Sequence, residues 1–349
     1  MDVFAMLASM GHERLVYCSD PEASYRAVIA VHSTRRGPAM GGTRLWTYPD
    51  EDAAAHDVLR LARAMTFKAA LAGLPLGGGK AVILHPAGAF DRERLFRAHG
   101  RFVDSFGGGF ITAEDVGVTP ADLAWVRRET PHVKGLADEA GDPAPFTARG
   151  VRRAIQAAAH ERWGSDDLAG RKVALQGCGA VGAHLARELH ERGANLVVAD
   201  VDAQRAQAVA QATGARVVEA DAVHREAAEV FAPCALGGVL NDVTIAELQA
   251  ELVAGAANNQ LGEARHGELL QERGVLYAPD YAANAGGLIS GCIDILGWSR
   301  EQALAKTDAI YDTLRQVFAR ARSAGLPTSR AADETVAEIL AAPGTEQPR

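Results

Sequence analysis

The chain has 349 residues, of which 48% are hydrophobic and 23% charged, a composition typical of globular proteins and a length that fits two domains. Its formal net charge of −8 disfavours a nucleic-acid partner, and no apolar run reaches the roughly 18 residues that a membrane span requires. The four cysteines stand far apart without metal-ligand spacing, and the N-terminus lacks a basic secretory segment, so we expect a cytoplasmic protein without a bound metal.

The first part of the chain alternates strand-like and helical segments. Residues 51–64 have the apolar spacing of an amphipathic helix, and Thr119 followed by Pro120 predicts the start of another. A turn-rich stretch over 134–145 predicts a loop between two domains, and a helix is expected from 147 to 163. Three apolar runs predict strands: 25–32, 81–85 and 110–112.

The second part repeats short apolar strands between helices, which predicts a parallel sheet with helices on both faces. The chain is expected to be helical from residue 300, with a break at 325–327. We therefore predict an α/β protein with a first α/β domain over 1–140 and a Rossmann-type, doubly wound dinucleotide-binding domain over 141–322. Residues 323–349 are expected to return to the first domain. The predicted strands are 173–176, 196–199, 229–232, 252–256 and 275–278.

Lysine is rare in this chain, and two lysines share one glycine-rich segment. Five of the 36 basic residues are lysine, and Lys68 and Lys80 stand twelve residues apart within 65–80. Arginine stays protonated in proteins, whereas a desolvated lysine can act as a base near neutral pH. We therefore take both lysines as candidates for chemistry, with plain surface charge as the alternative interpretation.

A G-x-G-x-x-G motif follows the predicted strand at 173–176 and opens a predicted helix. Gly177 permits the tight turn, Gly179 lets the backbone approach a pyrophosphate, and Gly182 allows close packing of helix and strand. Asp200 ends the next strand, where it would accept hydrogen bonds from ribose hydroxyls and repel a 2′-phosphate, which favours NAD over NADP. The predicted cofactor-binding residues here are Gly177, Cys178, Gly179, Ala180, Val181, Gly182, Asp200 and Val201.

Other polar residues follow predicted strand or loop ends, where open α/β sheets place their chemistry. Asp115 comes shortly after the strand at 110–112, and Asn258, Asn259 and Asn284 lie in the second domain. A carboxylate suits proton transfer, and amides suit binding of a substrate or of the nicotinamide carboxamide. Caps and turns explain each of these residues when it is taken alone.

Seven blocks together resemble the leucine/phenylalanine/valine dehydrogenase branch of the amino-acid (Glu/Leu/Phe/Val) dehydrogenase family, in order and over nearly the whole chain. This resemblance implies NAD-dependent oxidative deamination of an L-amino acid to its 2-oxo acid and ammonia. It also implies a homo-oligomer assembled through a first domain that binds substrate. The blocks are 37–44 (Gly-Pro-Ala-Met-Gly-Gly-Thr-Arg), 65–80, 112–117 (Thr-Ala-Glu-Asp-Val-Gly), 232–237 (Ala-Pro-Cys-Ala-Leu-Gly), 257–260 (Ala-Asn-Asn-Gln), 277–281 (Tyr-Ala-Pro-Asp-Tyr) and 284–287 (Asn-Ala-Gly-Gly).

The resemblance also implies roles for individual residues. Lys68 would bind the substrate carboxylate, Lys80 would be the general base that activates water, and Asp115 would carry protons to and from the amino group. Asn259 would hold that amino group or the cofactor, although the choice between Asn259 and Asn258 stays open. A catalytically silent NAD-binding regulatory protein is the distant alternative, which the retention of both lysines and Asp115 disfavours.

The predicted side-chain pocket is apolar. Met40 stands where the glutamate-specific relatives have a lysine, so a glutamate carboxylate would be buried without a partner. Ala113 resembles the leucine type, Leu288 resembles the phenylalanine type, and Gly291 departs from both. Leucine or another branched-chain substrate is the first prediction, and phenylalanine or another aromatic amino acid is the alternative. The predicted substrate-binding residues besides Lys68 and Asn259 are Gly42, Met40, Met65, Ala113, Leu288 and Gly291.

Overall fold

The computed structural model describes residues 3–136 and 141–342, which divide into two compact units. Residues 323–337 belong to the second unit, although the sequence predicts that the whole segment from 323 returns to the first domain. Of the described part of that segment, 338–342 is grouped with the first unit. Among the described residues, the first unit contains 3–136, 141, 294–296 and 338–342, and the second contains 142–293 and 297–337.

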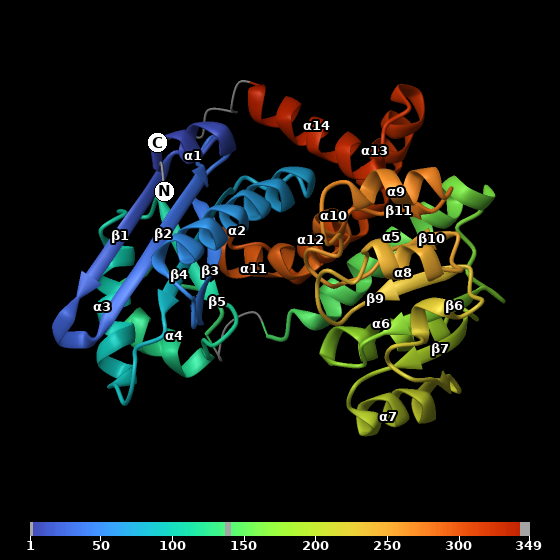
Figure 1. Ribbon diagram of the computed structural model, residues 1–349, viewed down its shortest axis with the longest axis horizontal. Coiled ribbons are helices and arrows are strands. Elements are labelled where there is room, and N and C mark those ends of the chain that lie inside the picture. The colour runs from blue at the N-terminus through green and yellow to red at the C-terminus, as the bar shows by residue number, and fades with distance from the viewer. Residues whose placement is uncertain (1–2, 137–140, 343–349) are drawn as a thin grey trace. The chain divides into compact units, whose positions relative to one another are not determined.

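The first unit is built on a five-stranded sheet with the order β1-β2-β4-β3-β5 (Figure 1). Strand β2 runs antiparallel to both neighbours, whereas β3 runs parallel to β4 and β5. The strands are β1 (Arg14–Asp20), β2 (Tyr25–Ser33), β3 (Ala39–Trp46), β4 (Gly77–Leu84) and β5 (Phe110–Glu114). The helices are α1 (Val3–Met10), the 3₁₀ turn η1 (Pro21–Ala23), α2 (Glu51–Leu71), α3 (Arg92–Asp104) and α4 (Pro120–Arg127).

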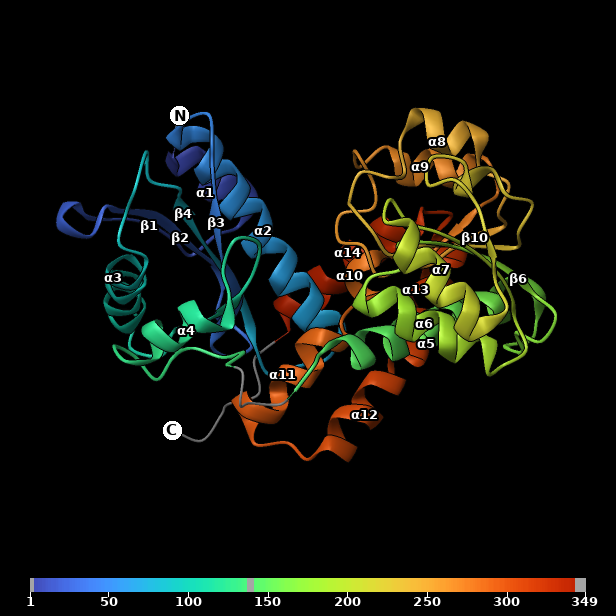
Figure 2. The same ribbon diagram turned by 90° about the horizontal axis from the view of Figure 1, so that it is seen from below.

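Helix α2 covers one face of this sheet, and α3 and α4 cover the other (Figure 2). On the α2 face, Val58 and Leu59 pack into one apolar cluster with Val82 of β4. On the opposite face, Phe96 of α3 packs in a larger cluster with Phe110 of β5. Burial of these apolar side chains from two sides makes the sheet a rigid platform for the polar residues that it carries.

The helix predicted over 51–64 continues about two turns further, to Leu71. Asp50 caps its first turn, where the carboxylate accepts a hydrogen bond of 2.7 Å from the amide of Ala53. The helix ends shortly before Gly73, which has a φ of +60°. The longer helix places Lys68 in its last turn. The predicted Thr119 cap of α4 is confirmed, with a capping box to Asp122.

The second unit is a six-stranded parallel sheet with the order β11-β10-β9-β6-β7-β8. Numbered from β6 onward, this order is that of a Rossmann fold, so the predicted fold class is confirmed. The strands are β6 (Lys172–Gln176), β7 (Asn195–Ala199), β8 (Arg216–Val217), β9 (Val230–Pro233), β10 (Leu252–Val253) and β11 (Leu276–Tyr277). The helices are α5 (Ala144–Trp163), α6 (Ala180–His190), α7 (Ala203–Thr213), the 3₁₀ turn η2 (Val223–Arg225), α8 (Asp242–Glu247), α9 (His266–Glu272), α10 (Asp280–Ala283), α11 (Gly286–Leu296), α12 (Arg300–Asp308), α13 (Ile310–Ala324) and α14 (Thr328–Ala341).

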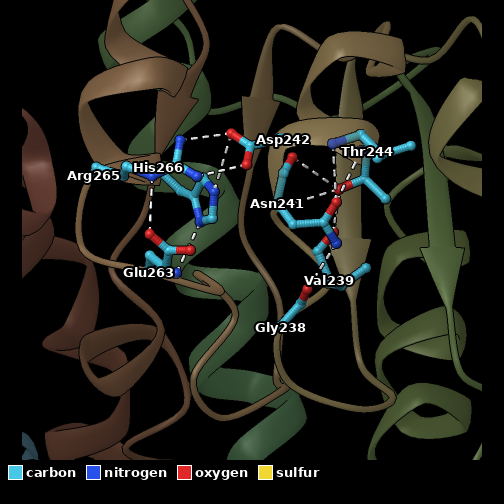
Figure 3. A network of polar contacts seen from close by, with 9 residues as sticks. Gly238, Val239, Asn241, Asp242, Thr244, Glu263, Arg265 and His266 are labelled. Atoms are coloured by element: carbon cyan, nitrogen blue, oxygen red, sulfur yellow. Dashed lines mark hydrogen bonds and ion pairs between the residues drawn. The ribbon is translucent and has the colours of Figure 1, made fainter.

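A polar network fixes the loop between β9 and α8 (Figure 3). Asn241 caps α8 and also donates a hydrogen bond of 3.0 Å to the carbonyl of Gly238, while the hydroxyl of Thr244 donates to the carbonyl of Val239. On the other side of α8, Arg265 forms a two-nitrogen ion pair with Asp242. The loop is therefore held by side chains that sequence reasoning did not single out.

Candidate active site

One face of the first sheet collects most of the predicted chemical residues of that unit. Side chains alternate along a strand, and the register pairs Met40 with Gly78 and Gly42 with Ala113. Lys80 lies two residues beyond Gly78, and Asp115 two residues beyond Ala113, so all these positions belong to the same face as Val82, which packs under α2. The predicted residues of this unit that the face brings together are Met40, Gly42, Lys80, Ala113 and Asp115.

Helix α2 passes so close to Gly78 of β4 that a side chain at this position would clash with the helix backbone. A Cβ added to Gly78 would lie 2.1 Å from the backbone nitrogen of Thr66, and one added to Gly42 would lie 2.4 Å from the carbonyl oxygen of Glu114. Met65 and Lys68, which stand one turn apart on α2 and are half-buried, flank this close approach. Gly78 therefore lets the helix bring two further predicted residues to this face, and Gly42 lets the end of β5 approach β3.

Lys80 is buried, and its amine contacts the carboxylate of Asp115. The residue is 6% exposed, and its Nζ lies 2.9 Å from Asp115 Oδ2. Burial lowers the pKa of Lys80, which the nearby Asp115 carboxylate opposes and the Arg44 guanidinium assists. Burial alone would raise the pKa of Asp115, but the two cations hold it below its ordinary value. The protonation of Lys80 therefore depends on that of Asp115 and vice versa, and the two groups can exchange a proton with little solvent around them.

Arg44 is part of this cluster, and sequence reasoning gave it no role. Its Nε lies 2.9 Å from Asp115 Oδ2, and its second nitrogen lies 3.0 Å from Asp57 Oδ2 on α2. Tyr48 donates a hydrogen bond of 2.7 Å to the same Asp57 oxygen. Its spacing is the feature by which Arg44 could have been predicted. Arg44 stands two residues after Gly42 and four after Met40, so the three residues share one side of β3.

The predicted dinucleotide turn has the backbone geometry that a pyrophosphate requires. Gly177 has a φ of +99°, and a Cβ on Gly182 would lie 1.9 Å from the carbonyl oxygen of Gly177, so neither position accepts a side chain. A Cβ on Gly179 would meet nothing within 4 Å, and Gly179 caps α6 without a side-chain hydrogen bond. The first turn of α6, which begins with Ala180, thus presents backbone amides to open space.

Asp200 stands directly after β7 and is fixed by two backbone amides. Its Oδ2 accepts a hydrogen bond of 2.6 Å from the amide of Cys178 inside the glycine turn, and its Oδ1 accepts one of 2.8 Å from the amide of Asp202. These bonds hold the carboxylate beside the turn. Val201 next to it is 96% exposed. The turn and the carboxylate fit a dinucleotide cofactor.

The predicted asparagines lie close together, with Asn258 and Asn259 in the loop after β10 and Asn284 at the end of α10. The amide of Asn284 is buried and donates hydrogen bonds of 3.1 Å to the carbonyl of Ala256 and 2.8 Å to Asn258 Oδ1. Its own Oδ1 is buried without a hydrogen-bond partner among the described residues. Asn259 is exposed, with a φ of +51°, and its carbonyl accepts a hydrogen bond of 2.7 Å from the amide of Gly238.

Leu288 and Gly291 lie one turn apart on α11 and are both half-buried, so they share one side of that helix.

None of the described helices is both long enough and apolar enough to cross a membrane.

Two family models, and relatives of known sequence and structure, match most of this chain. A family model described as Glu/Leu/Phe/Val dehydrogenase, dimerisation domain, matches residues 12–132, and a second, described as Glutamate/Leucine/Phenylalanine/Valine dehydrogenase, matches 142–206 and 198–341. The chain is 46% identical to leucine dehydrogenase of Geobacillus stearothermophilus over 343 residues, which covers 97% of this chain and 94% of that protein. It is 43% identical to phenylalanine dehydrogenase of Thermoactinomyces intermedius over 344 residues, with 97% and 94% covered. The crystal structure of L-tryptophan dehydrogenase from Nostoc punctiforme matches with a TM-score of 0.88 and 45% identity, and 97% of this chain and 98% of that one are covered.

Proposed function

The chain belongs to the Glu/Leu/Phe/Val family of amino-acid dehydrogenases, and from this premise we propose that it oxidatively deaminates an apolar L-amino acid with NAD. Leucine or another branched-chain amino acid is the proposed substrate. The observation that carries the proposal is the pair of buried Lys80 and half-buried Asp115, 2.9 Å apart, on the same sheet face as Met40. Burial lowers the pKa of the Lys80 amine, and an amine with a lowered pKa suits the role of general base.

In the proposed reaction, Lys68 binds the substrate carboxylate, and Asp115 takes a proton from the substrate ammonium group. NAD, held by the glycine turn and Asp200, would supply the oxidant by accepting the hydride of Cα with its electron pair, which would leave a substrate iminium. Lys80 takes a proton from a water molecule as the water oxygen bonds to the iminium carbon. Asp115 returns its proton to the nitrogen and then accepts the hydroxyl proton as the C–N bond breaks. Ammonia and the 2-oxo acid leave, and both side chains release their protons to solvent.

The apolar character of the substrate is supported by Met40, which is 6% exposed on the proposed substrate face. A glutamate side chain placed against Met40 would bury a carboxylate without a cation, at a cost of roughly several kcal/mol. Leucine dehydrogenase and phenylalanine dehydrogenase are both relatives above 40% identity, so overall likeness alone does not choose between branched and aromatic substrates. Ala113 on β5 favours the leucine type.

We expect initial rates of NAD reduction to be highest with L-leucine, L-isoleucine or L-valine and at least about 100-fold lower with L-glutamate. The measurement is the kcat/KM of each amino acid, including L-phenylalanine and L-tryptophan, with one enzyme preparation at one pH. A preference for L-glutamate would contradict the apolar pocket, because Met40 offers its carboxylate no partner.

An aromatic L-amino acid is the second candidate substrate. Leu288 resembles the phenylalanine type, and Gly291 on the same side of α11 leaves room beside it. The likeness to a tryptophan dehydrogenase of known structure also favours this candidate. The same panel of amino acids separates the two, because one ring or one methylene changes kcat/KM by about 10- to 200-fold.

The choice of NAD over NADP is proposed from Asp200. We expect Asp200→Asn to lower kcat/KM for NAD about tenfold and to raise the NADP/NAD ratio, because the charged acceptor for the ribose hydroxyls and the repulsion of a 2′-phosphate are lost together. Asparagine still offers an oxygen to the amide of Cys178, so the turn keeps its support. Asp202→Asn is the matched control, since asparagine also caps α7. An unchanged NADP/NAD ratio in Asp200→Asn would contradict the ribose assignment.

We also propose a homo-oligomer assembled through the first unit. The support is the family model over residues 12–132, whose description is a dimerisation domain.

A further inference from the structure

Arg44 connects the proposed catalytic pair to helix α2. The Arg44 guanidinium forms two ion pairs in different directions. Its Nε contacts Asp115 after β5, and its Nη1 contacts Asp57 on α2. We propose that Arg44 is a positioning residue for the deamination, which orients the Asp115 carboxylate for Lys80 and keeps a permanent positive charge beside that amine. This inference rests on the proposed function, because it assigns Arg44 a role in a reaction carried out by Lys80 and Asp115.

The contact with Asp115 is shared with Lys80. Lys80 Nζ and Arg44 Nε both lie 2.9 Å from the same oxygen, Asp115 Oδ2. Two donors from neighbouring strands fix the rotation of that carboxylate better than one donor does, since they approach one atom from β4 and from β3. Asp115 follows the last residue of β5, and the backbone of Val116 also forms a hydrogen bond with its carboxylate.

Arg44 is itself held in place from the other side. Asp57 Oδ2 accepts from Arg44 at 3.0 Å and from Tyr48 at 2.7 Å, while its Oδ1 accepts from Arg60 at 3.0 Å. The Arg44 side chain is 22% exposed and that of Asp57 is 17% exposed, so these contacts are only partly screened by solvent. Lysine could not replace Arg44, because a single ammonium group does not reach two carboxylates that lie in different directions.

The charge of Arg44 acts on both members of the pair. The groups that face Lys80 are Asp115 after β5, Arg44 on β3 and Asp57 on α2. Burial is the largest cause of the lowered pKa of Lys80, and Arg44 lowers it further, whereas both carboxylates raise it. Arg44 also contributes to the lowered pKa of Asp115. Loss of Arg44 should therefore raise the pKa of both groups, and an enzyme that needs neutral Lys80 should then require a higher pH.

Three variants test the inference, each assayed for NAD reduction with the best L-amino acid over a range of pH. Arg44→Met removes the charge, Arg44→Lys keeps the charge without the double contact, and Arg60→Gln is the control. Arg60 is an exposed arginine that contacts the other oxygen of Asp57 and has no contact with Asp115 among the described interactions. Circular dichroism and NADH binding check that each variant is folded.

We expect Arg44→Met to lose at least about tenfold in kcat, with the acid limb of its pH profile displaced to higher pH. Arg44→Lys should lose a similar factor with its acid limb near that of the wild type, and Arg60→Gln should stay within about twofold of the wild type. If Arg44→Met does not fold, Arg44→Lys still decides on the positioning role.

Activity of Arg44→Lys within about twofold of Arg60→Gln would overturn the positioning role. A loss in folded Arg44→Met that is equal at every pH would overturn the role of the charge. If the wild-type enzyme oxidises no L-amino acid, the proposed function fails and this inference fails with it. An active wild type with unaffected Arg44 variants would overturn the inference alone.

Discussion

Replacement of Lys80 by alanine is expected to reduce amino-acid oxidation by at least about 1,000-fold while NADH still binds with normal affinity. The variant removes the amine that contacts the Asp115 carboxylate and that takes the proton from the attacking water in the proposed reaction. NADH binding should persist because the glycine turn and Asp200 belong to the other unit. The measurements are single-turnover NAD reduction and NADH fluorescence titration.

The matched control for this prediction is Lys172→Ala, which removes a lysine at the start of β6 in the second unit. We expect it to retain activity within about twofold, because Lys172 lies at the opposite end of its strand from the glycine turn. Near-normal turnover in Lys80→Ala would remove Lys80 from the role of base. Loss of NADH binding in the same variant would instead point to a defect in folding.

The proposed dinucleotide site has a sequence pattern because its parts are local. A strand, a glycine turn and a helix follow one another within a few residues, and the acidic residue at the end of the next strand completes the pattern. The structure adds a contact that no motif contains, namely the hydrogen bond from the amide of Cys178 to Asp200. Such a bond depends on the three-dimensional pairing of β6 and β7, which local patterns do not describe.

The cluster in the first unit could be predicted only in part, because its members are distant in sequence and meet through strand pairing. Lys80 and Asp115 were found by residue type and resemblance, but β3 was not predicted as a strand. Its two adjacent glycines, Gly41 and Gly42, weaken the strand pattern in sequence. Without a predicted strand at this position, the sequence pattern does not indicate that Arg44 lies on the same side as Met40 and Gly42. It also does not indicate the ion pair between Arg44 and Asp57.

The second large effect is expected from Asp115→Asn, which should reduce kcat by about 100-fold or more. The amide cannot accept the proton of the substrate ammonium group or return it to the leaving nitrogen, although its size matches the carboxylate. The variant also leaves Lys80 and Arg44 side by side, with Asp57 as the remaining facing carboxylate. Removal of one partner of a largely buried charge pair typically costs about 3–5 kcal/mol, so we expect a lowered free energy of unfolding in a denaturant titration.

The pH dependence of Asp115→Asn distinguishes an electrostatic effect from a merely structural one. Asp115 raises the pKa of Lys80, so its loss should lower that pKa further. The residual activity should therefore have its acid limb at lower pH than the wild type, which is the direction opposite to that expected for Arg44→Met. Asp104→Asn, at an exposed position on α3 across the sheet, is the control for the loss of one carboxylate. An acid limb that moves in the same direction in Asp115→Asn and Arg44→Met would contradict the idea that these two charges act in opposite senses on one buried amine.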